Sequence, residues 1–176
     1  MIIKKLYLLF IFISSVLFSQ EYISVDKTDN NREHIKLVNM NINELKDSIF
    51  NSSKNIKVIY FFNNYCSQSL KFTPYLNEIY LKNKDKFDLF VISRKKPKKI
   101  EQLYNYLFYE GYYFPVFNVS KESFKSIANV LCADCNQKIM GYSDFFILDN
   151  NNILLSQSNY DLSTTEKIKV LKNYLN

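Results

Sequence analysis

The chain has 176 residues, of which 47% are hydrophobic and 23% are charged, and its formal net charge is +6. This length is enough for one domain with a hydrophobic core. The basic excess is modest, and it falls by two if the first 19 residues are removed, so the charge gives no indication of a nucleic-acid partner.

The N-terminus predicts a secretory signal peptide over residues 1–19. Two lysines precede an apolar run at 6–18, and the small residue Ser19 stands before Gln20. The apolar run is shorter than the roughly 20 residues that cross a bilayer. We therefore expect cleavage between Ser19 and Gln20, no stable membrane anchor, and a periplasmic or secreted protein.

The rest of the chain predicts a flexible polar lead-in over residues 20–34 and one domain over 35–176. Apolar periodicity and turn residues predict, in chain order, a strand at 35–38, a helix at 42–51, a strand at 57–62, a helix after Cys66, a strand at 87–93, a helix from Ile100 that stops at Gly111, a strand at 114–118, a helix after Ser120, a hairpin of 145–149 with 153–156, and a helix after Ser163. This alternation is typical of βαβ units, and the hairpin adds antiparallel strands. The sequence predicts an α/β fold with a central mixed sheet flanked by helices.

Two of the predicted helices begin with capping boxes, in which a capping side chain and a Glu three residues later satisfy free backbone N–H groups. The pairs are Asn41 with Glu44 and Ser163 with Glu166. The hairpin turn at 150–152 consists of three asparagines, which tolerate left-handed backbone conformations.

Residues 58–78 resemble the active-site region of thioredoxin-like proteins, in particular exported TlpA-like thiol–disulfide oxidoreductases. In that family an apolar strand leads through an aromatic residue into Cys-x-x-Cys, and a proline follows five residues later. Tyr65, Cys66 and Pro74 match this pattern, whereas Ser69 takes the place of the second cysteine. The resemblance covers nearly the whole domain and implies a thioredoxin-like three-layer sandwich with an extra helix–strand insertion.

The resemblance implies that Cys66 is the attacking cysteine and that Ser69 completes a monothiol site. A cysteine at the start of a helix lies beside free backbone N–H groups, which favour the nucleophilic thiolate. Ser69 can hydrogen-bond to a thiolate but cannot form a disulfide, so mixed disulfides with a substrate would persist. We expect protein thiols or disulfides as substrates, and no cofactor.

Two further positions differ from the family pattern. Ser143 aligns with the proline whose cis peptide normally faces the active-site cysteine. Tyr60 aligns with the buried acid that assists proton transfer in thioredoxins, and a phenol is too weakly acidic to replace that group near neutral pH.

Cys132 and Cys135 leave three interpretations open. They are a structural disulfide, or a redox pair that resolves mixed disulfides at Cys66, or half of a zinc site. Zinc is the weakest of these because only Cys66 and His34 remain as further ligands, and we predict no metal. We assign no role to His34.

These residues are compatible with three functions. The leading hypothesis is an exported thiol–disulfide oxidoreductase with a Cys-x-x-Ser site, and the alternative is a redox-inactive binding module that uses the same groove. Peroxidatic chemistry at Cys66 is weaker, because Asn63, Asn64 and Tyr65 stand where threonine and proline usually precede a peroxidatic cysteine. The basic run from Arg94 to Lys99 lacks interleaved aromatics and predicts a solvated loop.

Overall fold

The computed structural model describes residues 35–175, so the predicted signal peptide, the lead-in and His34 lie outside the described residues. Within that range the strands are β1 (Leu37–Asn39), β2 (Ile56–Phe61), β3 (Phe87–Ser93), β4 (Val116–Asn118), β5 (Phe145–Asp149) and β6 (Leu154–Gln157). The α-helices are α1 (Ile42–Phe50), α2 (Ser67–Asn83), α3 (Ile100–Tyr109), α4 (Phe124–Leu131) and α5 (Thr164–Leu175). Short 3-10 helices, η2 (Pro97–Lys99) and η3 (Gln137–Ile139), precede α3 and β5. The order of strands and helices is the predicted one.

The six strands form one mixed sheet with the order β1-β4-β3-β2-β5-β6. Strands β1, β4, β3 and β2 are parallel, whereas β5 runs antiparallel to β2 and β6 runs antiparallel to β5. This confirms the predicted α/β fold with a mixed sheet.

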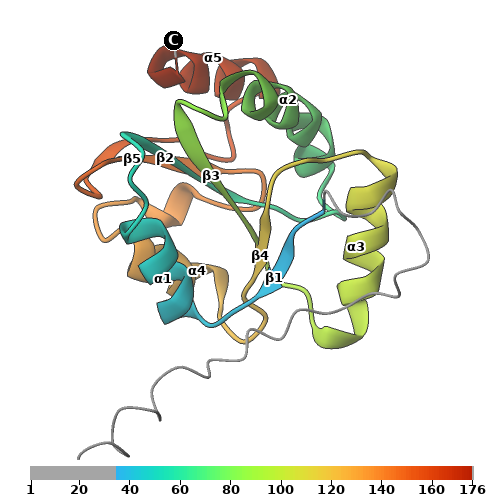
Figure 1. The fold of residues 1–176 in the computed structure, drawn as a ribbon. Coiled ribbons are helices and arrows are strands. Elements are labelled where there is room, and N and C mark those ends of the chain that lie inside the picture. Colours follow the sequence, from blue (N-terminus) through green and yellow to red (C-terminus); the bar gives the residue numbers. More distant parts are fainter. Residues whose placement is uncertain (1–34, 176) are drawn as a thin grey trace, which may run out of the picture.

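Helices cover both faces of the sheet, because the central strand β2 is apolar on both sides. Val58 and Tyr60 belong to a core cluster that includes buried residues of α2, α3 and α5. Ile59 and Phe61 belong to a second cluster with buried residues of α1 and α4. Figure 1 shows α2 and α5 above the sheet and α1 and α4 below it. The result is a three-layer arrangement.

The predicted capping boxes are both present. Asn41 Oδ1 accepts the N–H of Glu44, and the Glu44 carboxylate accepts the N–H of Asn41. Ser163 and Glu166 make the same reciprocal pair at the start of α5. Asn152 has φ 64 in the hairpin turn, so the left-handed position falls in the predicted asparagine run.

Some boundaries differ from the prediction for identifiable reasons. Helix α4 begins three residues later than expected, because Ser123 rather than Ser120 caps it and accepts the N–H of Ser126 at 2.9 Å. Strand β1 begins at Leu37, where its pairing with Val116 of β4 starts. Among residues 35–175, none of the helices combines the length and apolar character needed to cross a membrane.

Candidate active site

Cys66 lies between the end of β2 and the start of α2, where it is the N-cap residue of the helix. Its N–H donates to Asn63 O at 3.0 Å, and its carbonyl accepts the N–H of Leu70 at 3.0 Å. The side chain makes no capping hydrogen bond, and the thiol is free and half-buried. Cys66 therefore lies at the positive end of a helix of 17 residues, and its sulfur makes no capping hydrogen bond to the helix.

Ser69 lies one turn into α2 and is fully buried. Its Oγ accepts the N–H of Asn63 at 3.4 Å, which ties the first turn of the helix to the turn that precedes Cys66. The side chain of Ser69 thus supports the backbone that carries Cys66.

A chain of buried hydroxyl groups continues behind this turn. Thr73 Oγ1 donates to the carbonyl of Ser69 at 2.6 Å. Because the only hydroxyl proton of Thr73 is used there, the Tyr60 hydroxyl is the donor in its 2.9 Å contact with Thr73 Oγ1. Tyr60 lies on β2, so this chain joins the central strand to the active-site helix.

Burial raises the pKa of Tyr60 to about 12. The hydrogen bond with Thr73 acts in the opposite direction, and a charge on Cys66 adds to the increase. A phenol that keeps its proton to this pH cannot accept one from a reacting thiol near neutral pH.

Ser143 lies beside the end of β2. Its N–H donates to the carbonyl of Phe61, the last residue of β2, at 2.7 Å, and its φ is 76. Peptide bonds are trans throughout residues 35–175, so this position is reached without a cis bond. Ser143 Oγ is buried and has no hydrogen-bond partner among the described residues.

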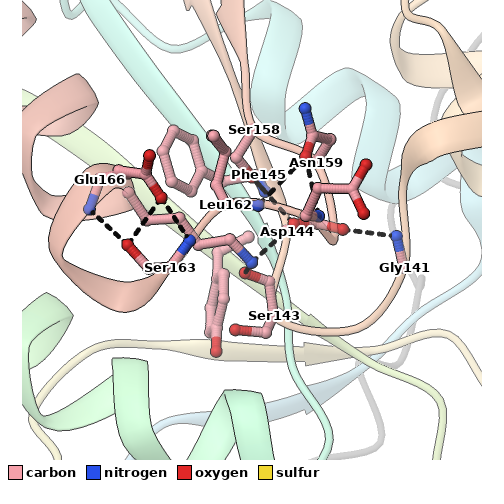
Figure 2. Close-up of polar contacts among 12 residues, drawn as sticks. Gly141, Ser143, Asp144, Phe145, Ser158, Asn159, Leu162, Ser163 and Glu166 are labelled. Carbon is pink, nitrogen blue, oxygen red and sulfur yellow. Dashed lines mark hydrogen bonds and ion pairs between the residues drawn. The ribbon is translucent and has the colours of Figure 1, made fainter.

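A buried ion pair holds the Ser143 loop in place. Lys167 Nζ of α5 lies 2.7 Å from Asp144 Oδ1, and it also donates to the carbonyl of Ser143 at 3.0 Å. Asp144 further accepts the N–H of Gly141 at 2.7 Å and the hydroxyl of Ser158 at 3.1 Å. Figure 2 shows Asp144 between Gly141 and Ser158, beside the capped start of α5. Both charged side chains are almost completely buried.

This ion pair was not predicted, although the sequence contains a signal for Lys167. Lys167, Leu171 and Leu175 are spaced four residues apart, so they share one face of α5. A lysine in an apolar stripe indicates a buried partner, because an unpaired buried charge is very costly. The identity of that partner could not be read from spacing.

Cys132 and Cys135 are bonded to each other, with their Cα atoms 5.4 Å apart. Both are buried in the core cluster of α1 and α4, whereas the buried residues of α2 belong to the cluster on the other face of the sheet. The structure thus places Cys66 and Ser69 at the start of α2 and Ser143 beside the end of β2, whereas the disulfide lies in a different layer. No group of three or more potential metal-ligating side chains occurs among residues 35–175.

Comparisons with known proteins give matches in structure alone. No family model matches the chain, and no curated protein matches it. The thioredoxin domain of a thiol–disulfide oxidoreductase from Bacteroides vulgatus is 18% identical, with 70% of this chain and 81% of that chain covered and a TM-score of 0.53. A thiol:disulfide interchange protein from Bacteroides sp. is 20% identical, with coverages of 75% and 78% and a TM-score of 0.53.

An exposed lipoprotein thioredoxin from Streptococcus pneumoniae is similar at 15% identity, with 69% of this chain and 86% of that chain covered and a TM-score of 0.50. Identities this low establish the fold and leave the activity open. The sheet order, the two helical layers and these likenesses agree with the resemblance in the sequence: the protein has the thioredoxin-like fold.

Proposed function

We propose that the protein is an exported monothiol thiol–disulfide exchange protein that reacts with protein thiols or disulfides through Cys66. The observation that carries this proposal is a free, half-buried thiol at the N-cap of α2. The thiolate is the attacking form in disulfide exchange.

The reaction is a thiolate–disulfide exchange. The Cys66 thiolate attacks one sulfur of a substrate disulfide, a bond forms between the two sulfurs, and the other substrate sulfur leaves as a thiolate. Electrons and atoms balance without a further oxidant. The product is a mixed disulfide between Cys66 and the substrate.

Resolution of this mixed disulfide requires a thiol from outside the site. Ser69 stands where a second cysteine would attack, and its hydroxyl cannot form a sulfur–sulfur bond. Cys132 and Cys135 are already bonded to each other in the opposite core layer, so we assign them a structural role. The substrate or a small thiol then acts as the resolving nucleophile.

Export is part of the proposal. A secretory signal peptide at residues 1–19 would deliver the chain to an oxidising compartment, where the Cys132–Cys135 disulfide persists. The pneumococcal neighbour is an exposed lipoprotein, which supports an extracytoplasmic location for this chain.

Trapping of mixed disulfides tests the function. Producing cells are quenched with acid and alkylated, and adducts of the protein are separated with and without reductant. We expect reductant-sensitive adducts for the wild type and none for Cys66→Ser. Ser69→Cys is the matched variant, because a second thiol at that position should release the substrate and reduce the adduct level. Equal adducts in the wild type and Cys66→Ser would overturn the proposal.

A redox-inactive binding module is the second candidate, and the environment of Tyr60 favours it. Because burial raises the pKa of Tyr60 to about 12, the site holds a neutral phenol where a thioredoxin has a proton-transferring acid. In this case partners would be recovered with Cys66→Ser as well as with the wild type, and no adduct would depend on reductant.

A further inference from the structure

The basic loop between β3 and α3 is joined to the turn that presents Cys66. Lys95 is only 8% exposed, and its Nζ lies 3.2 Å from Asn63 Oδ1. The same oxygen accepts the N–H of Tyr65 at 3.0 Å, and Asn63 O accepts the N–H of Cys66. The prediction of a freely solvated loop is therefore wrong for Lys95, which anchors the loop at the candidate active site.

Tyr65 forms the surface between this loop and Cys66. Its ring is 64% exposed, with Lys95 Nζ 4.1 Å and Lys99 Nζ 5.6 Å from the ring centroid. The Tyr65 hydroxyl donates to Gln102 Oε1 at 3.1 Å, which fixes the ring against the start of α3. An exposed aromatic side chain next to the free thiol is thus flanked by cations on one side.

None of the ion pairs among residues 35–175 involves a lysine of the loop. The ion pairs there join Lys82 to Glu78 and Lys167 to Asp144. Glu101 is the single acidic residue between positions 94 and 106. The pKa of Lys95 is lowered, mainly by burial and further by the charge of Lys99. Acidic groups of a partner would relieve this repulsion.

We propose that the substrates of Cys66 carry acidic side chains next to the reacting sulfur, and that these side chains dock on the Lys95–Lys99 loop beside Tyr65. The inference rests on the proposed function and names its substrate class. Lys96, Lys98 and Lys99 are exposed, so they supply the accessible charges. The buried Lys95 instead joins the loop to the turn that precedes Cys66.

An acidic protein segment fits this surface better than a membrane does. Lys95 Nζ and Lys99 Nζ lie over the ring of Tyr65, the residue before Cys66, so a partner that reaches the thiol meets this positive charge. A lipid headgroup supplies negative charge but no sulfur for the exchange. The juxtaposition of cations, an exposed ring and a free thiol indicates a peptide that carries both carboxylates and a cysteine.

Exchange kinetics with charged peptides test this inference. Three peptides with a central cysteine flanked by glutamates, glutamines or lysines are prepared as mixed disulfides with thionitrobenzoate. The Cys66 thiolate attacks the peptide sulfur, and the released thionitrobenzoate anion is followed by its absorbance. Each rate is divided by the rate for a small neutral thiol, which removes intrinsic differences between the peptides. At low salt we expect the acidic peptide to react about tenfold faster than the basic one.

Matched charge reversals locate the effect. Lys96→Glu/Lys98→Glu should remove the preference for the acidic peptide, whereas Lys125→Glu/Lys138→Glu, the same charge change on exposed residues near α4, should retain it. Added salt should reduce the preference in the wild type.

The outcomes separate the inference from the function on which it rests. Equal normalised rates for the three peptides overturn the inference and leave thiol exchange at Cys66 intact. Absence of reaction with any peptide overturns both. If the peptides react equally and Lys96→Glu/Lys98→Glu abolishes binding to phosphatidylglycerol vesicles, the loop is a membrane contact and the inference is wrong.

Discussion

The two sides of Cys66 are held by different kinds of interaction. On the α2 side, neutral hydroxyls of Tyr60 and Thr73 support the first turn of the helix. On the loop side, the backbone at Ser143 is held by the buried ion pair of Lys167 and Asp144. Neutral hydrogen bonds add little net stability, whereas removal of one member of a buried ion pair leaves an uncompensated charge. The loop side is therefore the more vulnerable one.

Lys167→Met should have the largest effect. The variant keeps the apolar volume on the core face of α5 but leaves Asp144 without its cation, so we expect the free energy of unfolding to fall by about 3–5 kcal/mol. Urea unfolding followed by circular dichroism measures it. Lys172→Met, at an exposed position of the same helix, is the control and should change the free energy by less than about 0.5 kcal/mol. Similar losses for the two variants would contradict the assigned role of the ion pair.

Removal of the Cys132–Cys135 disulfide should have an intermediate effect. This bond lies at the start of the segment that leads to the Ser143 loop. The bond closes a short loop of sequence separation 3, so Cys132→Ala/Cys135→Ala should lower the free energy of unfolding by about 2 kcal/mol. Adduct formation at Cys66 should continue, because the bond lies in the other core layer. Loss of all adducts in a folded double variant would assign the pair a redox role.

Tyr60→Phe should have the smallest effect at neutral pH. Thr73 loses the hydrogen bond from the phenol but still donates to the Ser69 carbonyl, so we expect a loss of about 1 kcal/mol in the same urea assay. A loss as large as that of Lys167→Met would show that the two sides of Cys66 do not differ as described.

Tyr60→Phe also tests how the free energy of unfolding depends on pH in the alkaline range. The pKa of Tyr60 is about 12 in the folded protein, above the ordinary value of 10.0, so the folded state holds this proton more tightly than the unfolded state. The resulting stability is fully present below pH 10 and is lost as the pH rises towards 12. Free energies of unfolding measured between pH 9 and 12 should fall less steeply for Tyr60→Phe than for the wild type. Parallel curves would contradict this assignment.

The sequence sufficed for the fold because its main signals are local. The apolar residues of β2, the capping pairs of α1 and α5, and the asparagine turn each depend on neighbours within a few positions. The position of Cys66 at a helix start follows from the same local pattern, in which a buried strand is followed by helical periodicity.

The contacts that hold the candidate site in place could not be predicted, because they join segments that are distant in the sequence. Lys95 and Lys96 are adjacent in a basic run, yet the fold buries one and exposes the other. Asp144 is paired with a lysine 23 positions away, and no spacing rule connects them. The pairing of Cys132 with Cys135 likewise required the structure, since the sequence left a redox role beside a structural one.

The most direct measurement is the alkylation of the native protein with iodoacetamide at pH 7, followed by peptide mass mapping. We expect a single modification, at Cys66, in the folded protein, because this cysteine is free and half-buried at the start of α2. A native Cys66 that is modified only after the protein unfolds would contradict this expectation, since a sealed thiol cannot attack a substrate disulfide.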